Sequence, residues 1–105
     1  MGTDNFKTKP FDGAAGDIAV VDAVSGKKIA LHGYVIAADT ANGSMRFEDG
    51  AGGTALTGSM EMLIDAAVVA PFSNVPWAIG SVNTTLSLEA TSTGLAGHII
   101  YSEID

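Results

Sequence analysis

The chain has 105 residues, of which 47% are hydrophobic and 16% are charged, with a net charge of −7 and no cysteine. This composition excludes a disordered chain, and the length allows a single domain. Without cysteine there are no disulfides and no thiolate metal sites. The acidic balance argues against a nucleic-acid partner, because binding to the phosphate backbone needs a basic face.

Residues 1–16 are predicted to form an extended N-terminal arm in front of a β-sandwich domain at 17–105. The segment is rich in Gly, Thr and Asp, its charges cancel, and its only aromatic residues are Phe6 and Phe11. It is compatible with a frayed terminus, and equally with an arm that contacts a neighbouring subunit through the two phenylalanines. It has no apolar centre like that of a signal peptide, and no later run is long enough to predict a membrane span, so we expect no membrane partner.

From residue 17 onward the hydrophobic pattern predicts strands. A short buried run at 18–24 is followed by clear alternation at 27–38, 43–49, 59–65, 82–90 and 95–104. The segment 66–70 also favours a strand, because of its valines. In 27–38 one face is predicted to be aliphatic, with Ile29, Leu31, Gly33, Val35 and Ala37, and the other mixed, with Ala30, His32, Tyr34, Ile36 and Ala38.

Turn signals separate these runs every 8–12 residues, which is typical of a sandwich or barrel. Asn42-Gly43 predicts a hairpin turn with positive φ. No stretch has helical periodicity with caps. We therefore predict an all-β, antiparallel sandwich of seven or eight strands, jelly-roll-like or Greek-key.

The sequence contains no recognisable catalytic constellation. His32 and His98 both lie in mid-strand, and a two-histidine metal site would lack a third ligand. The segment 39–43 lacks the acids of a calcium loop, no serine lies in a Gly-x-Ser-x-Gly elbow, and the glycines of 50–58 do not form a phosphate loop. We therefore expect no enzyme activity, no cofactor and no metal.

The aromatic residues are few and give the candidate partner contacts. Pro71-Phe72 and Pro76-Trp77 lie in one predicted loop, which either caps the core or forms a tip that binds a partner or stacks on a sugar. A histidine on the mixed face of a strand is typical of an interface. The predicted partner-binding residues are Phe6, Phe11, His32, Tyr34, Phe72, Trp77 and His98.

Several short motifs follow one another in a recognisable order. They are KIALHGYVI at 28–36, FEDG at 47–50, TALTG at 54–58, Pro71-Phe72, LSL at 86–88 and GHIIY at 97–101. Over residues 27–104 this order resembles a group of small virion proteins encoded by tailed bacteriophages and prophages. One departure is Pro76, which stands before Trp77 where that group's pattern has glycine.

The resemblance implies a structural virion component of the capsid decoration (cement) type. Such a protein would be made in the cytoplasm of the host bacterium and would sit on the capsid surface as a homotrimer bound to the major capsid protein. Other small phage sandwiches serve the neck, tail or fibres, where a receptor or carbohydrate would be the partner. A small metal-dependent enzyme is the third interpretation.

Overall fold

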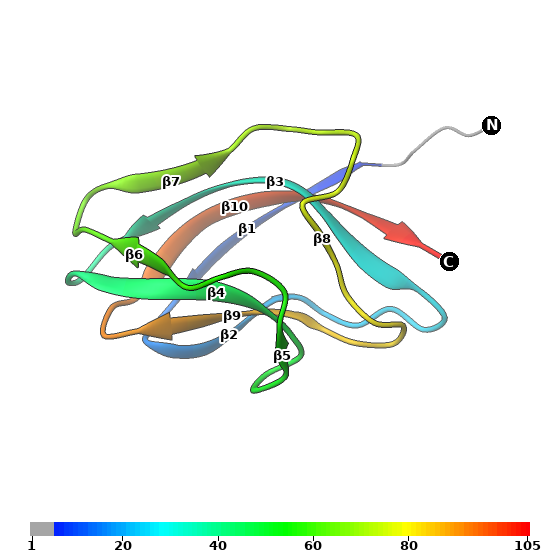
Figure 1. Cartoon of the computed structure of the whole chain (residues 1–105), viewed down its shortest axis with the longest axis horizontal. Coiled ribbons are helices and arrows are strands. Elements are labelled where there is room, and N and C mark those ends of the chain that lie inside the picture. The colour runs from blue at the N-terminus through cyan, green and yellow to red at the C-terminus, as the bar shows by residue number, and fades with distance from the viewer. Residues whose placement is uncertain (1–5) are drawn as a thin grey trace.

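Ten strands form two antiparallel sheets in the computed structural model, which describes residues 6–105. Figure 1 shows the sheets stacked one above the other. Sheet A contains β1 (Lys7–Gly13), β3 (Lys28–Ala38), β7 (Ala67–Ala70), β8 (Ala78–Ile79) and β10 (Leu95–Ile104). Sheet B contains β2 (Gly16–Val21), β4 (Gly43–Asp49), β5 (Thr54–Ala55), β6 (Met60–Met62) and β9 (Leu86–Thr91). The described part of the chain has no helix, and thus none able to cross a membrane.

The chain moves back and forth between the two sheets. Sheet A has the order β1-β10-β3-β7 with β8 also on β3, and sheet B has the order β2-β9-β4-β5 with β6 also on β4. The predicted all-β antiparallel sandwich is confirmed. The count of seven or eight strands was too low, because β5 and β8 have only two residues each and leave no alternation to detect. The strand order is compatible with a jelly roll, and that finer assignment stays a prediction.

The core lies between the inner faces of the two sheets. Its largest side chains, with almost no exposed surface, include Phe47, Ile29, Leu31, Ile36, Met45, Leu88, Leu95 and Ile99. Burying an aliphatic or aromatic side chain of this size contributes roughly 1.5–3 kcal/mol, so this layer holds the two sheets together.

A β-bulge at His32 changes which residues of β3 face inward. Gly33 pairs with Ile100 and Leu31 with Tyr101, so His32 is an extra residue opposite this step. Before the bulge Ile29 and Leu31 are buried in the core, and after it Tyr34, Ile36 and Ala38 are. The predicted faces of 27–38 were therefore wrong beyond His32, and Val35 lies on the outer side with 36% of its surface exposed.

The predicted N-terminal arm is in large part a strand. Lys7–Gly13 forms β1, which pairs along its whole length with β10. The Lys7 ammonium lies 2.9 Å from the Glu103 carboxylate, and the hydrogen bond and charge of Glu103 raise the pKa of Lys7. The boundary at residue 16 is corrected accordingly. Residues 1–5 of the predicted arm lie outside the described residues.

Asn42-Gly43 does not form the predicted hairpin. Neither residue has positive φ, and β3 and β4, which it joins, lie in different sheets. The Asn42 side chain instead accepts a hydrogen bond from the Ile64 amide at 2.8 Å. Glycine is required at 43 because β4 passes close to β9, where a Cβ would meet the Thr91 carbonyl oxygen.

Candidate partner-binding surface

One long segment of the chain carries no charge and follows the edge of sheet A. No Asp, Glu, Lys, Arg or His occurs between residues 66 and 88. β7 and β8 both pair with β3, and between them the Ser73 amide donates to the His32 carbonyl at 2.9 Å and the Trp77 amide to the Leu31 carbonyl at 2.7 Å. The segment is therefore fixed by main-chain hydrogen bonds to the rim of the sheet.

This rim exposes large hydrophobic side chains to solvent. All the exposed large hydrophobic residues among 6–105 except Phe6 and Val35 lie between residues 63 and 82. We name as the apolar edge surface the exposed members of this stretch, which are Leu63, Ile64, Val69, Phe72, Val75, Trp77, Ile79 and Val82. Val75 is the most exposed of them, at 76%. Exposed apolar patches of this kind mark interaction sites.

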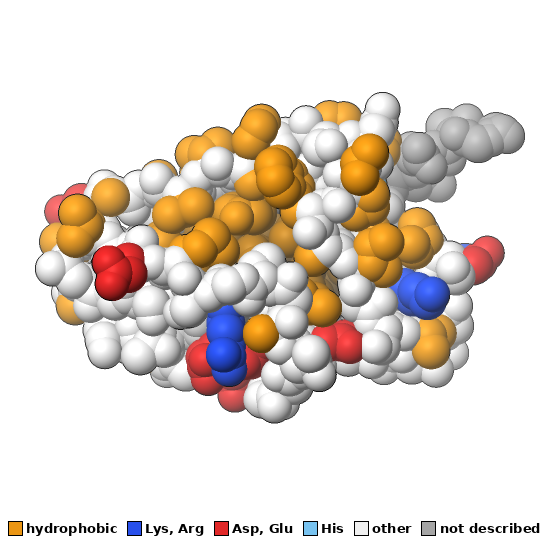
Figure 2. Space-filling view, in the orientation of Figure 1, with side chains coloured by type: hydrophobic (Ala, Val, Ile, Leu, Met, Phe, Trp, Pro, Cys, Tyr) orange, Lys and Arg blue, Asp and Glu red, His pale blue; other side chains and the backbone are white. Residues whose placement is uncertain are grey.

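The apolar edge surface continues into the gap between the two sheets. Leu56, Met60, Val68 and Ala78 are partly buried against the core. Figure 2 shows hydrophobic side chains gathered over β7, β3 and the chain leading to β8, with acidic and basic side chains below them and at the two ends. The face of the molecule is thus divided into an apolar and a charged part.

Three rings from distant segments meet on the outer side of sheet A. The Phe6 ring lies 4.8 Å from the His32 ring and 4.9 Å from the Phe72 ring, in both cases edge to face. His32, which follows the inward-facing Leu31, lies on this side and is 4% exposed beneath the two phenylalanines. Its Nδ1 is 2.8 Å from the Ser73 carbonyl oxygen and its Nε2 is 2.8 Å from the Ser102 hydroxyl.

These contacts make His32 an anchor for the segment that follows β7. With Nδ1–H donating to Ser73 and the Ser102 hydroxyl donating to Nε2, a neutral ring satisfies both of its nitrogens. Gly33 lets the anchored chain pass close over β3, because a Cβ there would lie 3.1 Å from the Ala70 carbonyl oxygen. Since both ring nitrogens are occupied, the two-histidine metal site with His98 has no free ligand on His32.

The other predicted contact residues fall into two groups. Trp77 is half-exposed, with its indole N–H donating to the Pro71 carbonyl at 3.1 Å, and His98 is exposed on the outer face of sheet A in register with Val35. Tyr34 and Phe11 instead pack on the core. The Tyr34 hydroxyl donates to the Met60 sulfur at 3.7 Å, and burial raises the pKa of this phenol.

The structure therefore brings together Phe6, His32 and Phe72, with Trp77 on the same segment. It corrects the expectation that His32 and Tyr34 present their side chains to a partner, because both are buried. Sequence reasoning missed Val69, Val75, Ile79 and Val82. The signal that could have found them was the run of 23 residues from 66 to 88 without a charge.

The outer face of sheet B carries a compact charged cluster. Asp17, Glu89 and Arg46 are neighbours across β2, β9 and β4, and the Arg46 guanidinium lies 3.0 Å from Glu48 and 3.1 Å from Glu89. Glu48 is fully buried and also accepts from the Gly52 amide at 3.3 Å. Carboxylate oxygens of Asp17, Glu48 and Glu89 lie within 4.8 Å of one another. Arg46 supplies a positive charge to two of these acids, Glu48 and Glu89.

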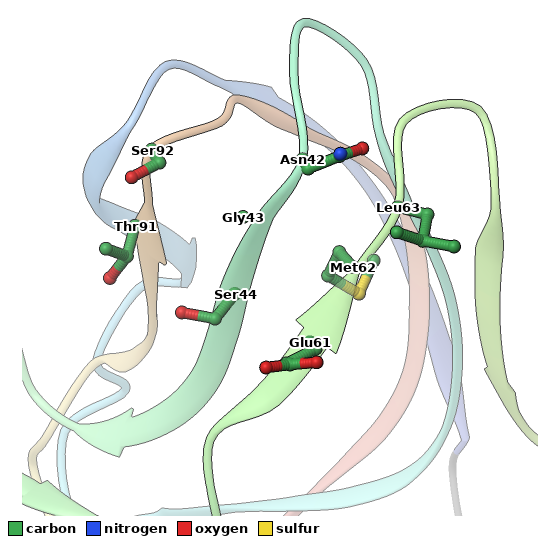
Figure 3. A pocket seen from close by; sticks show the side chains of 8 residues that line it. All are labelled: Asn42, Gly43, Ser44, Glu61, Met62, Leu63, Thr91 and Ser92. Carbon is green, nitrogen blue, oxygen red and sulfur yellow. The ribbon is translucent and has the colours of Figure 1, made fainter.

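A shallow hollow lies at one end of sheet B, between β9, β4 and β6. Figure 3 shows the side chains of Ser44, Thr91 and Glu61 around it. Its lining contains no histidine, lysine or arginine that could activate a hydroxyl as a nucleophile.

Comparison with known proteins identified no relative. No family model, curated protein or solved structure matches this chain. The apolar edge surface, with its uncharged rim and half-exposed aromatic residues, is therefore the feature from which a function has to be argued.

Proposed function

We propose that the chain is a structural protein of a bacteriophage virion, a capsid decoration subunit that binds the outside of the head and stabilises it. The observation that carries the proposal is the apolar edge surface, which a small acidic domain leaves uncovered on a fixed rim of strand and loop. Such a surface suits a permanent assembly contact. The order of motifs at 27–104 supports the phage assignment.

The mechanism would be mechanical. A homotrimer on the capsid surface would bridge neighbouring copies of the major capsid protein and raise the free energy needed to separate them against the pressure of packaged DNA. The net charge of −7 suits this position, because an acidic protein is repelled by DNA. Neither a catalytic group nor a cofactor takes part.

Reconstitution tests the proposal. Heads from a phage lacking this gene are mixed with the purified chain and pelleted, and their DNA release on heating is followed. We expect the chain to pellet with these heads and to raise the release temperature. Heads that already carry the chain are the matched control and should bind none. A chain that stays in the supernatant in both cases would overturn the proposal.

The part of the N-terminal arm that remains to be tested is residues 1–5. The longer deletion 1–16 would remove β1 from sheet A and would confuse binding with folding. A variant starting at Phe6 should keep the sandwich and lose affinity for heads, as expected of a tethered second contact. Unchanged binding by this variant would contradict a role for the arm.

A second candidate is a tail, neck or fibre module that binds a receptor or a carbohydrate. The observation that favours it is the pair of half-exposed aromatic residues Phe72 and Trp77, each of which follows a proline. Trp77→Ala should then abolish binding of the labelled protein to host cells, with Ala23→Asp, at an exposed position outside the apolar edge surface, as a control. Normal cell binding by Trp77→Ala would exclude this role for the aromatic pair.

A further inference from the structure

We infer that the apolar edge surface is covered by a second copy of this chain, so that copies meet through β7 and the segment that links it to β8. The inference rests on the proposed function, because it takes the proposed decoration protein to be a homo-oligomer. What it adds is the surface through which the copies would join. Three independent observations favour a second copy over a different partner.

The first observation is the distribution of charge. Every charged residue lies outside residues 66–88, although the chain has a net charge of −7. Two copies that met through any acidic part of the molecule would bring carboxylates together. The apolar edge surface is where two such chains can meet without this repulsion, because an uncharged surface is complementary to itself.

The second observation is the difference between the two edges of sheet A. The β1 edge carries Lys7, Lys9 and Pro10, which are residues that block further pairing at an exposed strand. The β7 edge reads Ala-Val-Val-Ala, without a charge or a proline. Within residues 6–105 β7 pairs only with β3, so its outer edge is open to a strand from another molecule.

The third observation is the area available. Six large hydrophobic residues of the apolar edge surface, from Val69 to Val82, are 46–76% exposed. At about 100 Å² for a half-exposed large side chain, the six of them offer roughly 600 Å², against about 800 Å² per partner in a standard interface. Uncharged polar residues between them, such as Ser73 and Asn74, would supply much of the remainder.

A closed assembly follows from these features. When two or three copies are related by a rotation axis, their apolar edge surfaces all face that axis, and the ring closes. The charged outer face of sheet B then points away from the axis, where it stays in water. Val75 and Trp77, which are exposed in a single chain, become buried.

The test measures the solution mass of the whole chain by light scattering, from micromolar to millimolar concentration. We expect a mass two or three times the 10.6 kDa of one chain. Val75→Asp places a charge on the apolar edge surface and should yield monomers, and Trp77→Ala should weaken association at least tenfold. Ala23→Asp makes the same change of charge at an exposed position outside the surface and should leave the oligomer intact.

Amide hydrogen exchange gives a second measurement that does not depend on variants. On dilution to monomers, amides of Ala67–Ala70 and of residues 73–77 should exchange faster, while those of β9 keep their protection. A chain that is monomeric at all concentrations, or an oligomer whose mass survives Val75→Asp, would overturn the inference. A monomer that pellets with heads would overturn this inference alone, and an oligomer that fails to bind heads would overturn the proposed function alone.

Discussion

The outer face of sheet B holds its charges in contact with one another, whereas the apolar edge surface carries no charge and leaves its large side chains uncovered. On sheet B, Arg46 pairs with both Glu48 and Glu89, and the buried Glu48 has all its partners within the chain. Along the rim from β7 to β8, hydrogen bonds fix the backbone while Val75 and Trp77 face solvent. The first region has its partners within one chain, whereas the second leaves a surface that the inferred oligomer would cover.

The largest expected effect comes from removing the positive charge of Arg46 from the charged cluster. Arg46→Met leaves Glu48 buried without its counter-charge, which should lower the free energy of unfolding by about 3 kcal/mol. Urea unfolding at neutral pH measures the loss. Lys27→Met is the matched control and should change little, because its partner Asp105 is exposed. Equal stabilities of the two variants would contradict the role given to Arg46.

The next largest effect should come from the anchor of the rim. His32→Ala removes two hydrogen bonds from a buried site and the ring beneath Phe6 and Phe72, which should cost about 2 kcal/mol. Amides of residues 71–77 should also exchange faster with solvent. His98→Ala, at the exposed histidine, serves as the control and should lie within about 0.5 kcal/mol of the parent. Unchanged exchange in 71–77 would show that His32 does not hold this segment.

The salt dependence of self-association is a third test of the difference between the two regions. In the inferred oligomer, copies that each carry a net charge of −7 would meet through an uncharged surface, so screening of their mutual repulsion should strengthen association several-fold between low and about 1 M salt. Light scattering over a salt series measures the dissociation constant. Association that weakens with salt would instead indicate ion pairs across the interface.

The smallest effect concerns Tyr34, which packs on the core. Sulfur is a weak acceptor, so Tyr34→Phe should change stability at neutral pH by less than about 0.5 kcal/mol. Burial raises the pKa of the folded phenol, so the unfolded chain ionises first, near its ordinary value of about 10. The free energy of unfolding is therefore unaffected by this group below that pH, and it decreases above that pH. This loss of stability at high pH should be smaller in Tyr34→Phe than in the parent chain. Identical pH profiles of the two proteins would contradict the prediction.

Much of the sandwich could be predicted from the sequence, because its long strands alternate between core and solvent. β3, β4 and β10 lie where the pattern placed them, at Lys28–Ala38, Gly43–Asp49 and Leu95–Ile104. β1 was missed because Lys, Pro and Gly have low strand propensity, and pairing with β10 overrides that preference. An edge strand often has this composition, since it discourages pairing with other chains.

Less of the surface could be predicted, because it depends on contacts between distant segments. The cluster of Phe6, His32 and Phe72 joins the residue before β1, a residue of β3 and the chain after β7. The bulge at His32 leaves no mark in a simple alternation, so the residues after it, such as Tyr34 and Val35, were assigned to the wrong sides. The loop aromatics Phe72 and Trp77 were predicted from the sequence, and the charge-free run at 66–88 marks most of the surface around them without giving its shape.

The interleaved strand order has a consequence for how the chain is made. β10 lies between β1 and β3, and β9 lies between β2 and β4, so residues 86–104 complete both sheets. During synthesis, β1 and β2 have no strand partner until these residues emerge from the ribosome, so the sandwich cannot close before then. For the same reason, a peptide with the sequence of residues 86–105 should restore the sandwich when it is added to a fragment that ends at residue 85.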